Sequence, residues 1–323
     1  MASKVNMGVQ NYLMELLMNG RLMQELEELG GEIRPASLRK CDEIVIEQPG
    51  FSAVIALWGG HLESFIPAGQ EDLLFQSTNL GGEGRFGRRH FGVPVCWPWF
   101  GANEAQPDFP AHGLARYFRW EFIEAGRFKN GDVKIVIRLA SEDHPLIEEM
   151  WPFAFELRQV FRFSDKGFRV NFSAANLSDK PMPISEALHT YFNVSDNQTA
   201  EVHGLDQVSY VDKFDNANQK LQQGVVTPCD YMDRVYTSAP EKCSIFDTGL
   251  QRRLVISTEG SNSTVLWNPG AEIAKQRTDM EDDDYRRFVC VEAGNALSDA
   301  YSIPVGGIHQ LKLKVKSKPL VDE

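Results

Sequence analysis

Two segments of this chain each place a side chain that can carry protons inside a strand-like pattern. His189 lies within SEALHTYFN (185–193), where alternation puts it on the same face as Ala187 and Tyr191. Glu292 lies within FVCVEA (288–293), on the face that also carries Cys290. Imidazole and carboxylate groups are common general acids and bases, so both segments are candidate catalytic elements.

Each side chain also has a structural interpretation. A single histidine in a strand is usually a hydrogen-bonded structural residue. An unpaired carboxylate in so apolar a strand is unfavourable. Glu292 therefore either forms a buried ion pair, for instance with Arg286 or Arg287, or is a general base whose pKa is raised by desolvation.

A third candidate is the stretch from Gly92 to Trp120, with four prolines, three tryptophans and three phenylalanines. Its prolines and glycines exclude a helix and its aromatic residues favour order, so we predict an ordered loop. The aromatic residues could simply fill the end of a core. Alternatively, the loop belongs to a local anion site, because basic residues cluster just before it and recur within it. These basic residues are Arg85, Arg88, Arg89 and Arg116.

The overall composition excludes several classes of protein. Lysine and arginine number 33 against 45 aspartates and glutamates, a formal net charge of -12, which argues against nucleic-acid or anionic-membrane partners. Five cysteines without a C-x-x-C pair argue against disulfides and a thiolate zinc site, and predict a cytoplasmic protein. The chain shows no metal-ligand spacing and no Gly-rich phosphate loop, so we predict no metal and no cofactor. Neither a membrane span nor a signal peptide is predicted.

Short strands must position the candidate residues. Period-two alternation predicts strands at 44–46, 54–58, 62–66, 133–139, 153–163, 168–174, 182–192, 253–258, 263–267, 288–293 and 308–316. No helix long enough for a crossover falls between them, so we predict largely antiparallel sheets. Leucines at helical spacing predict one helix from Tyr12 to Leu29, with Gly20 as a potential break. This helix could pack on the body of the protein or on a second subunit.

Seven ordered blocks give the chain a family resemblance from about residue 41 to the carboxyl end. They are GVPVCWPWFG, AHGLAR with WEF, LHTYFNV, YVDK, DRVY, VLWNP and FVCVE. In this order they resemble the hexose-6-phosphate mutarotases, the glucose-6-phosphate 1-epimerase branch of the galactose mutarotase-like proteins. The resemblance implies an all-β fold, a single large antiparallel β-sandwich over 41–323 with a sugar cleft on a concave face. Residues 1–40 would form an added N-terminal helical extension.

The resemblance also implies roles for individual residues. His189 would protonate the ring oxygen of the sugar, and Glu292 would remove the proton of the anomeric hydroxyl. His112 and Asp212 would hold the sugar. The candidate phosphate contacts are Arg116, the upstream Arg85, Arg88 and Arg89, and also Arg234. The predicted partner is a small sugar or sugar phosphate, and the resemblance is compatible with a monomer or a homodimer.

The chain departs from the family pattern at one place. The family usually has Arg-Gly-Gly-(Ile/Val)-Pro where this chain has His90-Phe91-Gly92-Val93-Pro94. Arg88 or Arg89 could substitute for the missing arginine. The leading hypothesis is therefore an isomerase that interconverts the anomers of a hexose 6-phosphate. The alternatives are a mutarotase for free sugars and a catalytically inactive protein that binds sugars or phosphosugars.

Overall fold

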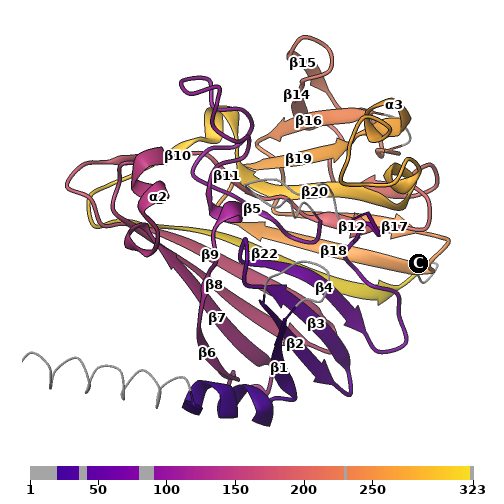
Figure 1. Cartoon of the computed structure of the whole chain (residues 1–323). Coiled ribbons are helices and arrows are strands. Elements are labelled where there is room, and N and C mark those ends of the chain that lie inside the picture. Colours follow the sequence, from indigo (N-terminus) through magenta and orange to yellow (C-terminus); the bar gives the residue numbers. More distant parts are fainter. Residues whose placement is uncertain (1–19, 36–41, 80–90, 229–230, 321–323) are drawn as a thin grey trace, which may run out of the picture.

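Two antiparallel sheets form the body of the protein (Figure 1). The computed structural model describes residues 20–35, 42–79, 91–228 and 231–320. Within them, sheet I has the strand order β15-β14-β16-β19-β20-β11-β5, with β12 also paired to β20. Its strands are β5 (Val95–Cys96), β11 (Glu186–Leu188), β12 (Tyr191–Asn193), β14 (Ser209–Asp212), β15 (Asn218–Leu221), β16 (Met232–Thr237), β19 (Ser263–Asn268) and β20 (Phe288–Asn295).

Sheet II has the strand order β13-β17-β18-β22-β9-β8-β7-β6. Its strands are β6 (Glu121–Arg127), β7 (Val133–Ala140), β8 (Phe155–Ser164), β9 (Gly167–Asn176), β13 (Glu201–His203), β17 (Lys242–Asp247), β18 (Arg252–Glu259) and β22 (Ile308–Pro319). Buried and exposed residues alternate along β8, β18 and β22, as period-two sequences require. One face of sheet II therefore packs on the core and the other faces solvent.

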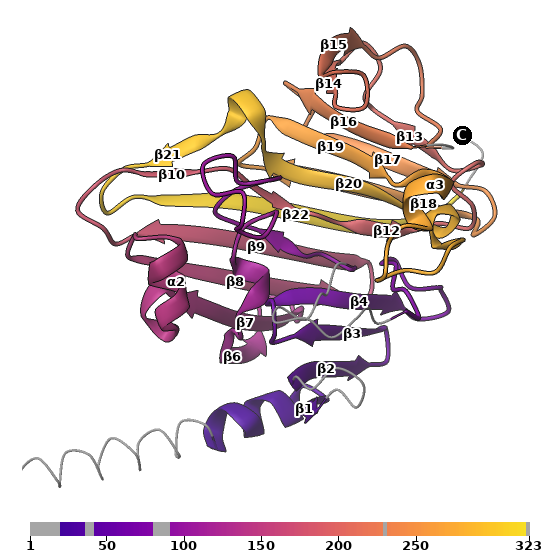
Figure 2. The same ribbon diagram turned by 45° about the horizontal axis from the view of Figure 1, so that its top comes forward.

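Two smaller sheets and several short helices complete the described structure. β1 (Gly31–Pro35), β2 (Asp42–Gln48), β3 (Phe51–Ala56) and β4 (His61–Pro67) form one sheet, and β10 (Met182–Ile184) pairs with β21 (Tyr301–Ile303). The helices are residues 20–28, α2 (Pro145–Met150), α3 (Gly270–Ala274) and the 3-10 turns η1 (Ala115–Tyr117), η2 (Ser141–Asp143), η3 (Asp284–Arg287) and η4 (Leu297–Asp299). Figures 1 and 2 show β1 to β4 at one end of the molecule and β14 and β15 at the other.

One large hydrophobic cluster joins these layers. It includes Val289 and Val291 of β20 in sheet I together with Leu311 and Leu313 of β22 in sheet II. On β4, Phe65 lies 5.8 Å from the ring of Phe163 in sheet II, so the four-stranded sheet packs on the same core. This arrangement confirms the all-β sandwich of antiparallel sheets that the sequence predicts. No helix in the described ranges is long and apolar enough to cross a membrane.

Some predicted elements differ from those in the structure. The run 182–192 forms three short strands, β10, β11 and β12. The chain pairs with β21 up to Ile184 and then with β20, and this second pairing is interrupted at His189 and Thr190, which lie outside the strands. Several strands were not predicted, among them β13 to β15, which have only three or four residues each. Such lengths are too short for alternation to stand out.

The amino-terminal segment contributes to the core. Residues 20–28 are helical, while Tyr12 and the rest of the predicted helix before residue 20 lie outside the described residues. Leu26 is fully buried in the main cluster, and Gly31–Pro35 pairs with β2 as a strand. The division between an extension at 1–40 and a domain at 41–323 stays a prediction.

Candidate functional site

The pairing of β20 with β11 and β12 brings the two candidate catalytic residues together. Leu188 pairs with Ala293 and Tyr191 pairs with Cys290, so both short strands keep one register along β20. Continuing that register one residue beyond Leu188 sets His189 opposite Glu292. Side chains that face each other across antiparallel strands are close neighbours. Two segments about a hundred positions apart in the sequence thereby form one site.

His189 and Glu292 are in direct contact. Nε2 of His189 lies 3.4 Å from Oε1 of Glu292, and the two side chains are 9% and 1% exposed. Burial raises the pKa of Glu292 well above 4.5, and the negative charge of Asp233 raises it further, while Lys213 and Arg116 oppose the shift. Oε2 of Glu292 accepts no hydrogen bond from the described residues. Within the described chain, the Glu292 carboxylate contacts His189, whereas Arg286 contacts Asp196. The role of Glu292 as a base stays a prediction.

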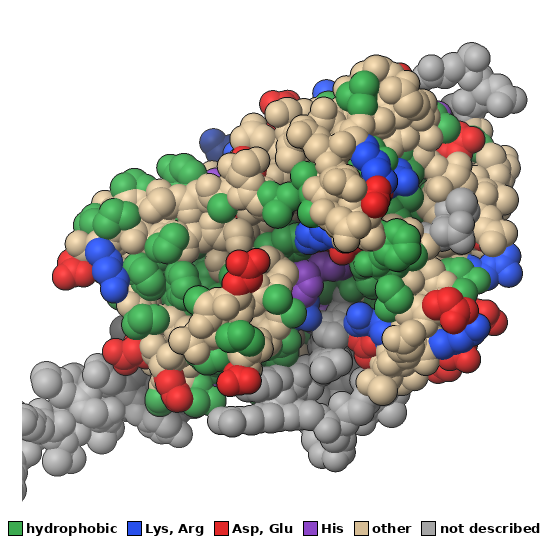
Figure 3. All heavy atoms as spheres, turned by 90° about the horizontal axis from the view of Figure 1, so that it is seen from above, with side chains coloured by type: hydrophobic (Ala, Val, Ile, Leu, Met, Phe, Trp, Pro, Cys, Tyr) green, Lys and Arg blue, Asp and Glu red, His purple; other side chains and the backbone are tan. Residues whose placement is uncertain are grey.

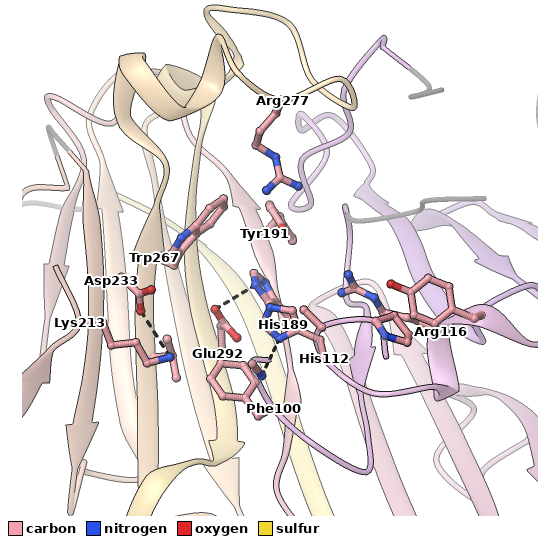
Figure 4. A pocket seen from close by; sticks show the side chains of 15 residues that line it. Phe100, His112, Arg116, His189, Tyr191, Lys213, Asp233, Trp267, Arg277 and Glu292 are labelled. Carbon is pink, nitrogen blue, oxygen red and sulfur yellow. Dashed lines mark hydrogen bonds and ion pairs between the residues drawn. The ribbon is translucent and has the colours of Figure 1, made fainter. Parts of the chain in front are cut away.

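A pocket of about 470 Å³ opens over this pair, within the size range of small-molecule sites. Figure 3 shows histidine side chains at the bottom of a hollow in this face, with basic side chains nearby. Figure 4 shows the residues around it. The lining residues are Phe100, Gly101, Pro110, Ala111, His112, Arg116, Tyr117, His189, Tyr191, Lys213, Asp233, Val265, Trp267, Arg277 and Glu292.

The aromatic loop supplies one wall of the pocket and also fills the core. Trp97 is fully buried, with its ring 4.5 Å from that of Phe155. His112 adopts φ 67° and Gly113 φ 79°, and a Cβ at Gly113 would lie 2.0 Å from the Trp97 carbonyl oxygen. This close approach requires glycine. The aromatic residues of the loop therefore fill the core, and they also hold the turn that presents His112 to the pocket. That the loop belongs to an anion site stays a prediction.

His112 and two aromatic rings surround His189. The Gly101 amide donates to Nδ1 of His112 at 3.3 Å, so in the neutral ring the proton lies on Nε2. The rings of His112 and His189 are 5.5 Å apart. His189 stacks on Tyr191 at 4.8 Å and meets Trp267 edge to face at 5.9 Å. These contacts fix the orientation of the imidazole beside Glu292.

Three cations and a second carboxylate complete the lining (Figure 4). Nζ of Lys213 lies 3.8 Å from Oδ1 of Asp233. The pKa of Asp233 is raised by burial and by Asp212, with Lys213 opposing. The guanidinium of Arg277 donates to both carboxylate oxygens of Asp279, at 2.9 and 2.8 Å. Arg116 is 9% exposed, and its Nε has no hydrogen-bond partner within the described chain.

The predicted site residues fall into three groups. His189, Glu292, His112 and Arg116 line the pocket. Asp212 and Arg234 do not line it, because each engages a neighbouring residue on sheet I. The Asp212 carboxylate contacts Nζ of Lys220 at 2.9 Å, and the Arg234 guanidinium lies 4.9 Å from the Tyr210 ring centroid. Arg85, Arg88, Arg89 and His90 lie outside the described residues. The roles that the resemblance implies for all of these residues stay predictions.

Among the pocket residues that were not predicted, Lys213, Asp233, Trp267 and Arg277 bring charge or a large aromatic ring to the lining. Lys213 and Asp233 are direct sequence neighbours of Asp212 and Arg234, so the YVDK and DRVY blocks each contain a residue that lines the pocket beside the predicted one, which does not. Trp267 lies in the VLWNP block, one of the blocks that carry the family resemblance. Arg277 lies in a loop after α3 where no motif or period marks it.

At the altered family motif, Phe91 packs behind the pocket. Its side chain is 7% exposed, and its ring lies 5.2 Å from Tyr191 and 5.3 Å from Phe75. Gly92 has φ 75°, and a Cβ there would meet the Leu62 carbonyl oxygen at 2.3 Å. The phenylalanine therefore supports the ring on which His189 stacks.

One group of side chains near the pocket has metal-ligand chemistry. Donor atoms of His189, Cys290 and Glu292 all lie within 4.8 Å of one another. Burial raises the pKa of the Cys290 thiol well above its ordinary 9.0, which disfavours the thiolate that a metal ion would need. The absence of a metal and of a cofactor stays a prediction.

Comparisons with known proteins agree on one family. A family model described as Aldose 1-epimerase matches residues 42–316. The chain is 35% identical over 273 residues to a protein of Escherichia coli (strain K12) named "Putative glucose-6-phosphate 1-epimerase", covering 84% of this chain and 89% of that protein. A protein of the same name from Cenchrus ciliaris is 30% identical over 250 residues, 74% of each chain. A crystal structure of a "putative mutarotase" from Salmonella typhimurium matches with a TM-score of 0.80 at 30% identity, covering 90% of this chain and 94% of that one.

Proposed function

Because the chain belongs to the aldose 1-epimerase family, we propose that it interconverts the α and β anomers of a hexose 6-phosphate in this pocket. The observation that carries the proposal is the contact between His189 and Glu292 at the base of a cavity of sugar size. The names of the relatives, glucose-6-phosphate 1-epimerase and mutarotase, support the same reaction.

Ring opening requires two proton transfers at neighbouring atoms. Glu292 removes the proton of the anomeric hydroxyl while His189 protonates the ring oxygen, and the bond between C1 and that oxygen breaks. Both oxygens are bonded to C1, so an acid and a base 3.4 Å apart can serve both of them. After rotation about the bond from C1 to C2, the same two groups return the protons and close the ring on the other face.

The surroundings of Glu292 suit the role of base. A base is most effective when its pKa lies near the working pH, and desolvation together with Asp233 raises the pKa of Glu292 in that direction. Holding both groups in reach of one sugar contributes further rate enhancement. His112, which lies beside His189, and Asp233 are positioned to hold sugar hydroxyls.

The charges of the pocket support a phosphorylated sugar. Arg116, Lys213 and Arg277 outnumber Asp233 and Glu292 in the lining, although the whole chain has a net charge of -12. Lys213 lies against Asp233, whereas Arg116 and Arg277 both act on Tyr191 electrostatically. We assign the phosphate to the side of the pocket between Arg116 and Arg277, where charge-assisted hydrogen bonds to arginine are strong. Three free buried thiols, Cys96, Cys243 and Cys290, support a cytoplasmic location.

Exchange NMR with glucose 6-phosphate, glucose and galactose tests the proposal. We expect the wild-type protein to accelerate anomer exchange of glucose 6-phosphate most, and His189→Asn and Glu292→Gln each to lower the rate by about 10²- to 10⁴-fold. His203 and Glu201 form a matched control, since they contact each other at 2.8 Å on sheet II outside the pocket. H203N and E201Q should keep full activity.

The possible results separate the alternatives. Equal rates with and without the 6-phosphate would favour a mutarotase for free sugars. Saturable binding of glucose 6-phosphate without any acceleration would favour an inactive binding protein. Unchanged exchange rates in E292Q would contradict the proposed mechanism.

A further inference from the structure

A row of cations crosses the solvent face of sheet II. In the strand register Lys134 of β7 pairs with Arg162 of β8, Arg162 pairs with Arg169 of β9, and Arg169 pairs with Lys314 of β22. The row continues through Ser257 of β18 to Lys242 of β17. We call these five basic residues the cation row. Figure 1 shows β7, β8, β9, β22 and β18 side by side across this sheet.

Like charges placed directly opposite each other destabilise a sheet, and the counter-ions of the cation row are unevenly distributed. At one end, Lys134 contacts Glu124 at 2.5 Å and Arg162 contacts Asp132 at 2.5 Å. Within the described chain, Arg169, Lys314 and Lys242 form no ion pair. The nearby Glu259 is held by Lys312 at 2.9 Å. Burial lowers the pKa of Lys314, as do the neighbouring Arg169 and Lys316. The middle of the row therefore has excess positive charge on an acidic protein.

This middle part is also hollowed. A cleft of about 390 Å³ is lined by Asn130, Asp132, Arg162, Ser164, Asp165, Lys166, Gly167, Phe168, Arg169, Lys314, Val315 and Lys316. It shares no residue with the pocket over His189. Its five cations exceed its two carboxylates, and Asp132 is already paired with Arg162.

The spacing of the cations indicates the kind of anion that fits. Neighbouring strands lie about 4.8 Å apart, so successive cations in the row are separated by about one strand. The row from Arg162 to Lys314 spans two such intervals, which is longer than a single phosphate group. A ligand with several linked phosphates repeats its charges along its length and can follow the row. We propose that this cleft is a second binding site, separate from the sugar pocket, for a linear polyphosphate group.

Calorimetry with inorganic tripolyphosphate tests the site directly. We expect one tripolyphosphate per chain, binding that weakens as salt is raised, and a higher melting temperature in its presence. The double variant R169Q/K314Q should bind about tenfold or more weakly, and it should keep full anomer exchange because neither residue lines the pocket. K318Q is the matched control, since Lys318 lies on the same strand but outside the cleft and should leave binding unchanged.

Two further measurements test which kind of phosphate compound binds and whether the cleft is separate from the sugar pocket. Orthophosphate should bind much more weakly than tripolyphosphate. A comparison of the affinities for ATP and for tripolyphosphate shows whether a nucleoside strengthens binding. The proposal is overturned if R169Q/K314Q binds tripolyphosphate as tightly as the wild type. It is equally overturned if glucose 6-phosphate displaces tripolyphosphate, because the anion would then occupy the sugar pocket. Neither result depends on whether the protein is an epimerase.

Discussion

At the scale of single residues, Glu292 connects the proposed mechanism to the stability of the fold. Its pKa is raised in the folded protein by burial and by Asp233, so the folded state binds a proton that the unfolded chain releases near pH 4.5. Stability is then fully present below pH 4.5 and falls as the pH rises through the folded-state pKa. The carboxylate that we propose as the base therefore destabilises the fold at working pH.

We expect Glu292→Gln to lower the rate of anomer exchange by about 10²- to 10⁴-fold and to raise the melting temperature relative to the wild type. The difference should be absent near pH 4 and should grow as the pH rises, because glutamine does not ionise. Melting curves between pH 4 and pH 9 measure it. E201Q, at a half-buried position outside the pocket, is the control. A difference that stays constant with pH would show that ionisation of Glu292 has no effect on stability.

Arg277 is the residue that should distinguish phosphorylated from free sugars. Hydrogen bonds to charged groups contribute about 1.5–3 kcal/mol, so Arg277→Gln should raise the KM for glucose 6-phosphate by about 10-fold to 100-fold. The rate with glucose should change little. Arg286 is the matched control, because it also pairs with an aspartate, Asp196, but lies outside the pocket. An equal loss for both sugars in R277Q would argue against a phosphate contact.

The residue scale also shows where sequence reasoning stops. His189 and Glu292 were identified because each stands out in an apolar strand. Lys213 and Asp233 were missed because polar residues occupy adjacent positions at those strand ends, so alternation does not decide which one faces the pocket. Arg277 belongs to an irregular loop, and only tertiary structure brings it to the site.

At the scale of elements, the site depends on one register and one turn. The shared register of β11 and β12 along β20 sets His189 against Glu292, and the turn at His112 and Gly113 closes the wall beside them. The sequence predicts strands at 182–192 and 288–293, which carry His189 and Glu292, and an ordered loop between residues 92 and 120. It could not predict which strands pair, because period-two patterns carry no information about partners.

We expect Gly113→Ala to disrupt the pocket. The added Cβ would approach the Trp97 carbonyl oxygen to 2.0 Å at a positive φ, and such strain costs about 1–3 kcal/mol or more. Activity and melting temperature should both fall. Gly131→Ala is the control, since Gly131 also has positive φ, at 91°, but no atom lies near its Cβ position. Equal melting temperatures for the two variants would show that the contact with Trp97 relaxes without loss.

At the scale of the whole molecule, composition and alternation were sufficient to predict the class of fold. Strands without crossover helices predict antiparallel sheets, and the apolar face of each strand predicts the core. The single large sandwich was implied by the family resemblance. The amino-terminal part was predicted less completely, because the strand from Gly31 to Pro35 gains its stability from pairing with β2. A local pattern cannot show a partner supplied by the rest of the chain.

Strand β20 has Val289 and Val291 in the central core on one face and Glu292 at the pocket on the other. The carboxylate of Glu292 is therefore held by a strand of the core and has no hinge of its own. Heat should inactivate this enzyme only when the sandwich itself melts, so the loss of turnover and the cooperative unfolding transition should share one midpoint. The highest temperature at which the enzyme works is then set by the stability of the core. Substitutions that improve core packing should raise that temperature and leave the rate of anomer exchange unchanged.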